Sequence, residues 1–215
     1  MLITIRTKLT VSQNNTEEET KESTLKQSLT NLLVNSDFED ATISPWEISE
    51  DDTDAIIEKS EEYAHSGNFG GIVVGRTEKG EGICQDITSA VEWGVNYEAS
   101  LWAKLIDVPE GYSESVRITV HNRMKQVING FDTYHDSYYH MTDCGTRLTN
   151  EWTKIVGSYL NDDDEVIEIL SLKLCFQGPS STAFAIDDVM FRVAKTRSDD
   201  GCGQNTEAVA LRRRL

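Results

Sequence analysis

The sequence predicts an all-β protein, a jelly-roll sandwich of two antiparallel sheets. The first observation is a polarity period of two in residues 97–104, where one face carries Tyr97, Ala99, Leu101 and Ala103 and the other Glu98, Ser100, Trp102 and Lys104. This alternation is typical of a strand that buries one face. The second observation is that similar short runs recur, separated by Gly, Ser, Asn and Asp, at 55–58, 71–75, 83–87, 115–121, 152–159, 171–177 and 183–193. Helical periodicity is nearly absent, and only residues 164–169 could be either helix or loop.

A single core flanked by two tails fits the length of 215 residues. Residues 1–30 are polar and acidic with few apolar anchors, so we expect a linker or disordered arm. Residues 195–215 are polar, contain glycine and end in a run of three arginines, so we expect a disordered tail. The predicted domain is therefore 31–194.

Charge and hydropathy exclude two classes of partner. The chain has 37 acidic and 20 basic residues, a net charge of -17, and its field would repel a nucleic-acid backbone. No run approaches the roughly 18 apolar residues that a membrane span needs. The opening residues 1–8 lack the long apolar stretch of a signal peptide, so we expect none in this chain.

The four cysteines, Cys84, Cys144, Cys175 and Cys202, are widely spaced and form no CxxC pair. They allow three pairings, which sequence does not separate. A domain of this size does not depend on disulfides, so counting alone favours free thiols for most of them.

Two segments near opposite ends of the predicted domain, 31–39 and 184–189, each place acidic side chains beside an apolar strand-like run. Acidic oxygens are the ligands that calcium prefers. The pair is interpreted as a clasp between the first and last strands.

Ten short motifs in a fixed order resemble the carbohydrate-binding modules of families 4, 9 and 22. They span the whole predicted domain: Asn31-Leu-Leu-x-Asn-x-Asp-Phe-Glu39, Pro45-Trp46, Ala64-His-Ser-Gly67, Gly75-Arg-Thr77, Gln85-Asp-Ile-Thr88, Gly94-x-x-Tyr97, Ser100-Leu-Trp102, Glu151-Trp-Thr153, Gly157-x-Tyr159 and Ile186-Asp-Asp-Val189. No motif is specific alone, and the resemblance rests on their order.

The resemblance implies a galactose-binding-like jelly roll with a structural Ca²⁺ and often a sugar-binding cleft on the concave sheet. Carried onto this chain, the calcium ligands would be Glu39, the backbone of residues 65–67, and Asp188, with Asp187 and Asp37 as lesser candidates. Alternatively, these carboxylates are solvated strand ends.

Sugar recognition needs aromatic faces and polar side chains, which the outward phase of each strand supplies. Trp102 has that phase and is either a ligand platform or a side chain covered by a loop. In residues 116–121 the outward phase is Arg117, Thr119 and His121, and His121 is either a ligand for a hydroxyl or a surface residue.

The aromatic run 131–140 is an insertion or hairpin that adds Tyr134 and Tyr138 as candidates, although such aromatics can also anchor the loop itself. Arg76 and Gln177 complete the predicted ligand site by resemblance.

The chain departs from the xylan-binding members at two positions. They commonly show Arg-Thr-x-x-Trp-x-Gly, whereas this chain has Gly80 where the tryptophan would be. They also show Glu-Gly-Pro or a similar triplet before the last strand, where this chain has Gln177-Gly-Pro179. Binding that is weakened, or directed to another glycan, is left open by these changes.

The function expected from the resemblance is a non-catalytic module that binds a polysaccharide, xylan or a β-glucan in particular. A glycosidase needs two carboxylates opposed across a cleft, and a chain with 37 acidic residues contains many possible pairs, so their number does not indicate a catalytic pair. The sequence also has no Gly-x-Ser-x-Gly elbow, no phosphate-binding glycine loop and no His-Glu-x-x-His motif. The alternatives are a structural or adhesive jelly roll that has lost sugar binding, or a fragment of a larger glycoside hydrolase. We expect a monomer that acts outside the cell, with an attached or lost catalytic domain.

Overall fold

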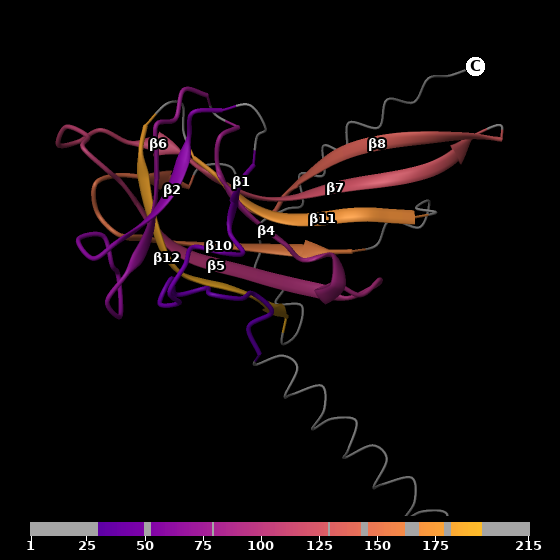
Figure 1. Ribbon diagram of the computed structural model, residues 1–215, viewed down its shortest axis with the longest axis horizontal. Helices are drawn as coiled ribbons and strands as arrows, with labels where there is room; N and C mark the ends of the chain where they lie inside the picture. Colours follow the sequence, from indigo (N-terminus) through magenta and orange to yellow (C-terminus); the bar gives the residue numbers. More distant parts are fainter. Residues whose placement is uncertain are drawn as a thin grey trace, which may run out of the picture.

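Two five-stranded antiparallel sheets pack face to face, as the alternating pattern predicts (Figure 1). The computed structural model describes residues 30–49, 53–78, 80–128, 130–142, 146–161, 168–178 and 182–194. The predicted all-β sandwich is confirmed. Both predicted tails, apart from Thr30, lie outside the described residues.

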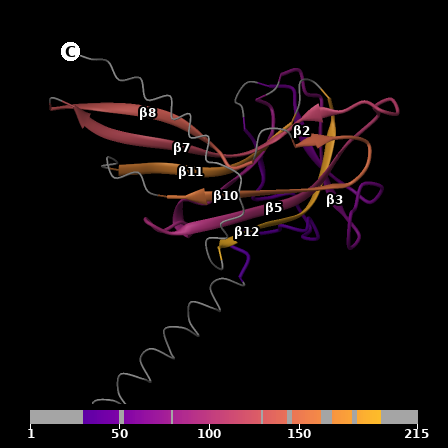
Figure 2. The ribbon, with the colours of Figure 1, turned by 180° about the vertical axis from the view of Figure 1, so that it is seen from behind.

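Sheet A carries the longest strand, β7 (Arg117–Ile128). The strand order of this sheet is β1 (Glu47–Ile48), β4 (Ile83–Asp86), β11 (Glu168–Gln177), β7 and β8 (Phe131–His140). β7 and β8 form the long hairpin that projects from the body of the molecule in Figures 1 and 2. The run 131–140 is therefore one strand of a hairpin, which settles the choice between insertion and hairpin.

Sheet B has the order β10 (Thr153–Leu160), β5 (Asn96–Leu105), β12 (Phe184–Val193), β3 (Gly70–Val74) and β2 (Ile56–Ser60). A separate two-stranded pair joins β6 (Glu114–Ser115) to β9 (Arg147–Leu148), and a single 3-10 turn, η1, spans Thr88–Ala90. Within the described part of the chain, no helix is long and apolar enough to cross a bilayer.

The core lies between the sheets and takes one phase of each strand. In β5 the buried phase is the predicted one, Tyr97, Ala99, Leu101 and Ala103. Sheet A contributes Ile83, Ile118, Val120, Leu172, Leu174 and Phe176. The opposite phase of sheet A is thereby committed to the outside of the sandwich.

Each of the eight predicted strands is present, and the sequence misjudged mainly their lengths. The run 115–121 becomes a twelve-residue strand, β7, preceded by the separate β6. The segment 164–169, left as helix or loop, ends in β11, because Glu168 and Ile169 pair with β7; residues 162–167 lie outside the described residues.

Cys84 and Cys175 form a disulfide between β4 and β11, where they are direct cross-strand partners. The expectation of free thiols is therefore wrong for these two residues, whereas Cys144 and Cys202 lie outside the described residues. Counting missed the bridge because the cysteines are 91 residues apart in sequence and become neighbours only in the antiparallel register.

Replacing both bridged cysteines with alanine should lower the free energy of unfolding by about 2–4 kcal/mol, since the bridge restricts a long segment of the unfolded chain. Urea unfolding checks this, with Cys202→Ala as the control that leaves the bridge intact. Alkylation of Cys84 or Cys175 in the denatured, unreduced protein would contradict the pairing.

Candidate functional site

The outer face of sheet A collects polar and aromatic side chains from four adjacent strands. Direct cross-strand pairing sets them in rows. One row contains Cys84, Cys175, Thr119 and His140; the next contains Asp86, Lys173, His121 and Tyr138; a third contains Ser171, Arg123 and Asp136. Because opposed residues in a sheet share a face, these side chains form one continuous surface.

The centre of this surface is a stacked pair of rings. His121 of β7 and Tyr138 of β8 have ring centroids 4.4 Å apart and an interplanar angle of 8°. His121 Nε2 lies 3.3 Å from Asp136 Oδ1, within ion-pair range but without the geometry of a hydrogen bond. Tyr138 is 53% exposed, so an aromatic ring is presented to solvent here.

A second group lies beside this pair, toward the start of β7. Arg117 Nη1 is 3.5 Å from His140 Nε2, and both side chains are exposed. The neighbouring positive charge and burial, chiefly burial, lower the pKa of His140 below its ordinary value. Thr119 is fully buried between them and the disulfide, and its Oγ1 finds no hydrogen-bond partner among the described residues. An unsatisfied buried hydroxyl costs about 1–3 kcal/mol, so this atom is poised to accept or donate a further hydrogen bond.

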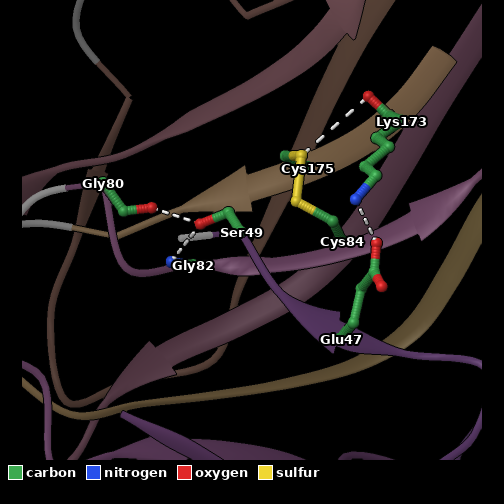
Figure 3. The surroundings of a disulfide bond; sticks show 7 residues. All are labelled: Glu47, Ser49, Gly80, Gly82, Cys84, Lys173 and Cys175. Carbon is green, nitrogen blue, oxygen red and sulfur yellow. Dashed lines mark hydrogen bonds and ion pairs between the residues drawn. A yellow bond between two sulfur atoms is a disulfide. The ribbon is translucent and has the colours of Figure 1, made fainter. Parts of the chain in front are cut away.

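The other side of the surface is closed by the protein itself (Figure 3). Lys173 of β11 forms an ion pair with Glu47 of β1, spanning the intervening β4. The disulfide is buried, with Cys84 0% and Cys175 2% exposed. The open part of the surface therefore lies over β7 and β8.

Arg76, one of the six predicted ligand residues, is inside the protein. It is 4% exposed and donates to the backbone carbonyls of Glu81, Glu78 and Thr182. Burial lowers the pKa of its guanidinium to about 10. The three hydrogen bonds order the loop between β3 and β4, and the burial of Arg76 leaves its side chain no access to a ligand.

The carboxylate of Glu81 fastens the same loop. It accepts hydrogen bonds from Thr53 Oγ1 and from the backbone N–H groups of Thr77 and Glu78. These bonds, led by that from Thr53, lower the pKa of Glu81 to about 2. Gly80, in the position where the resemblance leads one to expect tryptophan, uses its carbonyl to accept from Ser49 Oγ.

Trp102 lies on sheet B, on the other side of the sandwich from His121 and Tyr138. The His65 ring stacks on it at 4.1 Å, and Trp152 meets the same imidazole edge-on at 5.3 Å. Of the two interpretations open to Trp102, the structure therefore supports the one in which a loop residue covers it.

The two remaining predicted residues do face outward on sheet A. Gln177 is half-buried at the end of β11, directly opposite Arg117. Tyr134 is 57% exposed and lies opposite Lys125, farther out on the hairpin. His121, Tyr134, Tyr138 and Gln177 thus share one face, which excludes Arg76 and Trp102.

The predicted clasp joins the first described segment to β12. Asn31 donates from Nδ2 to Val189 O at 2.8 Å and accepts from Phe191 N at 2.9 Å, and Leu32 N donates to Phe191 O. These bonds connect residues about 160 positions apart. The amide of Asn31 thus holds the two segments together more directly than any acid does.

The acids instead hold the loop of residues 64–69. Asp187 is fully buried, and its Oδ2 accepts from the N–H groups of His65 at 2.8 Å and Ser66 at 3.0 Å, while Oδ1 accepts from Asp188 N at 2.7 Å. Asp188 accepts from Ser66 Oγ and lies 2.7 Å from His65 Nδ1. Burial, the largest influence, raises the pKa of Asp187 despite these donors.

Glu39 accepts hydrogen bonds from the other end of that loop. Its Oε1 accepts from the N–H groups of Asn68 at 2.6 Å and Phe69 at 2.9 Å, which lowers its pKa, with the Asn68 backbone donor as the largest cause. Gly67 is required between the two ends, because its φ is +63° and a Cβ there would lie 2.4 Å from Glu39 Oε1.

The three carboxylates suit calcium in kind but do not converge on one point. Among the described residues, no three acidic, histidine or cysteine side chains form a metal-sized group. No lysine or arginine in the described ranges forms an ion pair with Glu39, Asp187 or Asp188. The calcium ligands expected from the resemblance, which are Glu39, Asp188 and the backbone of residues 65–67, therefore stay a prediction.

Sequence reasoning missed Lys173 and the disulfide as parts of the surface. The signal was available in residues 171–177, where Ser171, Lys173, Cys175 and Gln177 alternate with buried leucines and a phenylalanine. The polarity pattern of residues 116–121 did place Arg117, Thr119 and His121 on the correct face.

Comparison with known proteins identifies relatives over most of the domain. A family model described as a carbohydrate binding domain matches residues 30–181. Endo-1,4-beta-xylanase A of Thermoanaerobacterium saccharolyticum is 25% identical over 129 residues, which are 60% of this chain and 10% of that enzyme. The chain thus spans about a tenth of the length of this relative.

Solved structures share the fold at lower identity. The tandem CBM22-1–CBM22-2 domains of Paenibacillus barcinonensis Xyn10C superimpose with a TM-score of 0.61 at 23% identity, over 77% of this chain and 46% of theirs. The CBM22-2 xylan-binding domain of the same protein gives 0.59 at 18% identity, over 74% of this chain and 98% of its own.

Replacing Asp187 with alanine should lower the free energy of unfolding by about 3 kcal/mol or more, because three N–H groups lose their acceptor. Asp187→Asn, which keeps one acceptor oxygen, should lose less. Denaturant unfolding measures both, with Asp40→Ala as an exposed control. Equal stabilities of Asp187→Ala and Asp40→Ala would contradict this role.

Proposed function

The chain belongs to the carbohydrate-binding domain family, and on that premise we propose that it binds a polysaccharide, xylan or a β-glucan, on the outer face of sheet A. It is a non-catalytic module, since its relatives in this region are binding domains and not catalytic ones. The observation that carries the proposal is the exposed Tyr138 ring stacked on His121 in the middle of that face.

The chemistry of this face suits a sugar. A pyranose presents an apolar side to an aromatic ring and hydroxyls at its rim, so a site needs a ring surrounded by donors and acceptors. Tyr138 supplies the ring, and Asp136 and Gln177 supply polar groups from neighbouring rows. Tyr134, farther along the same strand, would extend contact to another sugar unit.

The loss of the family's tryptophan at Gly80 shifts the site within this face. The loop between β3 and β4 offers no aromatic side chain between Arg76 and Gly82. Stacking would therefore depend on the hairpin of β7 and β8.

A structural or adhesive role without sugar binding is the alternative. Its support is the Lys173–Glu47 ion pair and the buried disulfide, which occupy the β4–β11 side of the face. Because these groups cover the β4–β11 side, only the β7–β8 side of the face would be open to a polysaccharide.

The relatives suggest where such a module works. One is a xylanase, and the solved structures include domains described as xylan-binding. We expect this module to act outside the cell, as a monomer, in a protein with a xylan-degrading catalytic domain or one that has lost it.

We also propose a structural calcium at the loop of residues 64–69. Its support is that Glu39, Asp187 and Asp188 all bond the same loop, and that within the described ranges none of them forms an ion pair with lysine or arginine, Asp188 lying against His65. A divalent cation would relieve this accumulation of negative charge.

Tyr138→Ala should weaken binding to xylan or β-glucan roughly tenfold or more, which corresponds to about 1.4 kcal/mol of lost stacking. Affinity electrophoresis against xylan, mixed-linkage glucan and cellulose, followed by calorimetry, measures this. Trp102→Ala is the matched control on sheet B and should retain binding. If Trp102→Ala rather than Tyr138→Ala removes binding, the site lies on sheet B and its assignment to sheet A is wrong. If the wild-type protein binds no polysaccharide, the proposed function is wrong.

Chelation should lower the melting temperature, because an ion bound only by the folded state stabilises it, by about 2.7 kcal/mol at a concentration 100 times its Kd. Thermal unfolding in excess EDTA and in millimolar CaCl₂ compares the two states. Equal melting temperatures would mean that hydrogen bonds alone close the loop.

A further inference from the structure

Arg117 is an exposed cation on the outer face of sheet A that has no acidic partner among the described residues. Lys125, Lys173 and Arg192 each form an ion pair with a carboxylate. In the described part of the chain, no carboxylate lies within ion-pair distance of Arg117, and its recorded side-chain contact is the imidazole of His140.

The groups around Arg117 are donors that suit an anion. His140 Nε2 lies 3.5 Å from Arg117 Nη1, and the pKa of His140 is lowered by burial first and by the Arg117 charge second. Thr119, directly opposite His140 and fully buried, has a hydroxyl with no partner among the described residues. Gln177 lies opposite Arg117 on the next strand.

A second arginine repeats the arrangement on the same strand face. Arg123 is six residues farther along β7, about 20 Å away at the rise of a strand. It is exposed and forms no ion pair within the described ranges, although Asp136 lies opposite it in register. Asp136 approaches His121 instead, at 3.3 Å. The two arginines thus flank the His121–Tyr138 pair.

We infer that the polysaccharide carries carboxylate groups, as in a xylan substituted with uronic acid, and that Arg117 binds one of them. This rests on the proposed function, whose site it extends. A guanidinium holds a carboxylate through two parallel N–H···O bonds, and the half-buried Gln177 amide, opposite Arg117, supplies a further donor beside it.

The net charge of -17 does not prevent this binding at physiological salt. The Debye length there is about 8 Å, so distant carboxylates are screened and contacts within the site decide.

The test compares glucuronic-acid-substituted xylan with the same polymer after its carboxyl groups are reduced to primary alcohols. By calorimetry at about 0.15 M salt, a physiological ionic strength, the wild-type protein should bind the carboxylated polymer several-fold more tightly. Arg117→Gln should remove this preference while retaining the affinity for the reduced polymer. Lys154→Gln, which removes an exposed cation from sheet B, should retain the preference.

The outcomes separate this inference from the proposed function. Equal binding of the two polymers by the wild-type protein would overturn the inference and leave polysaccharide binding intact. A preference that survives in Arg117→Gln would overturn the assignment to Arg117. If the wild-type protein binds neither of the two polymers and no neutral glycan, the proposed function is overturned and the inference with it.

Discussion

The register between β4, β11, β7 and β8 is the constraint on which the rest of the structure depends. Each strand can bury only one of its two phases, so a slip by one residue would exchange every inward and outward side chain. In the observed register, Leu174 and Val120 enter the core while Cys175, Thr119 and His140 line up outside. The disulfide fixes β4 against β11 at one rung of this ladder. The aromatic pair and its polar surroundings exist as a surface only because this register aligns them.

The opposite sheet is held by a different device, a set of carboxylates that accept backbone N–H groups. Asp187 and Glu39 hold the two ends of the loop that contains Gly67, and that loop in turn places His65 over Trp102. Carboxylates therefore order a loop beside sheet B, whereas the outer face of sheet A carries both acids and cations, with Asp136 opposite Arg123 in register.

The period of two was enough to predict the fold and to place His121 on an outward face, whereas Tyr138 was chosen from the aromatic run 131–140 and Gln177 from the family resemblance. It could not say which sheet a strand joins, because alternation is the same in both; Trp102 and His121 therefore appeared equivalent although they lie on opposite sheets. Nor could it show that Arg76 is buried, since that depends on the carbonyls of Glu81 and Thr182. The Cys84–Cys175 bridge likewise needed the pairing of two strands far apart in sequence.

The central claim is that a polysaccharide binds on the outer face of sheet A around Tyr138 and His121. The most direct measurement is an NMR titration of the isotope-labelled protein with xylo-oligosaccharides, including uronic-acid-substituted ones. The account predicts shifts concentrated at β7, β8 and the outward residues of β11, led by His121, Tyr138 and Arg117. Shifts concentrated instead around Trp102, His65 and Trp152 on sheet B, or no shifts with any oligosaccharide, would contradict it.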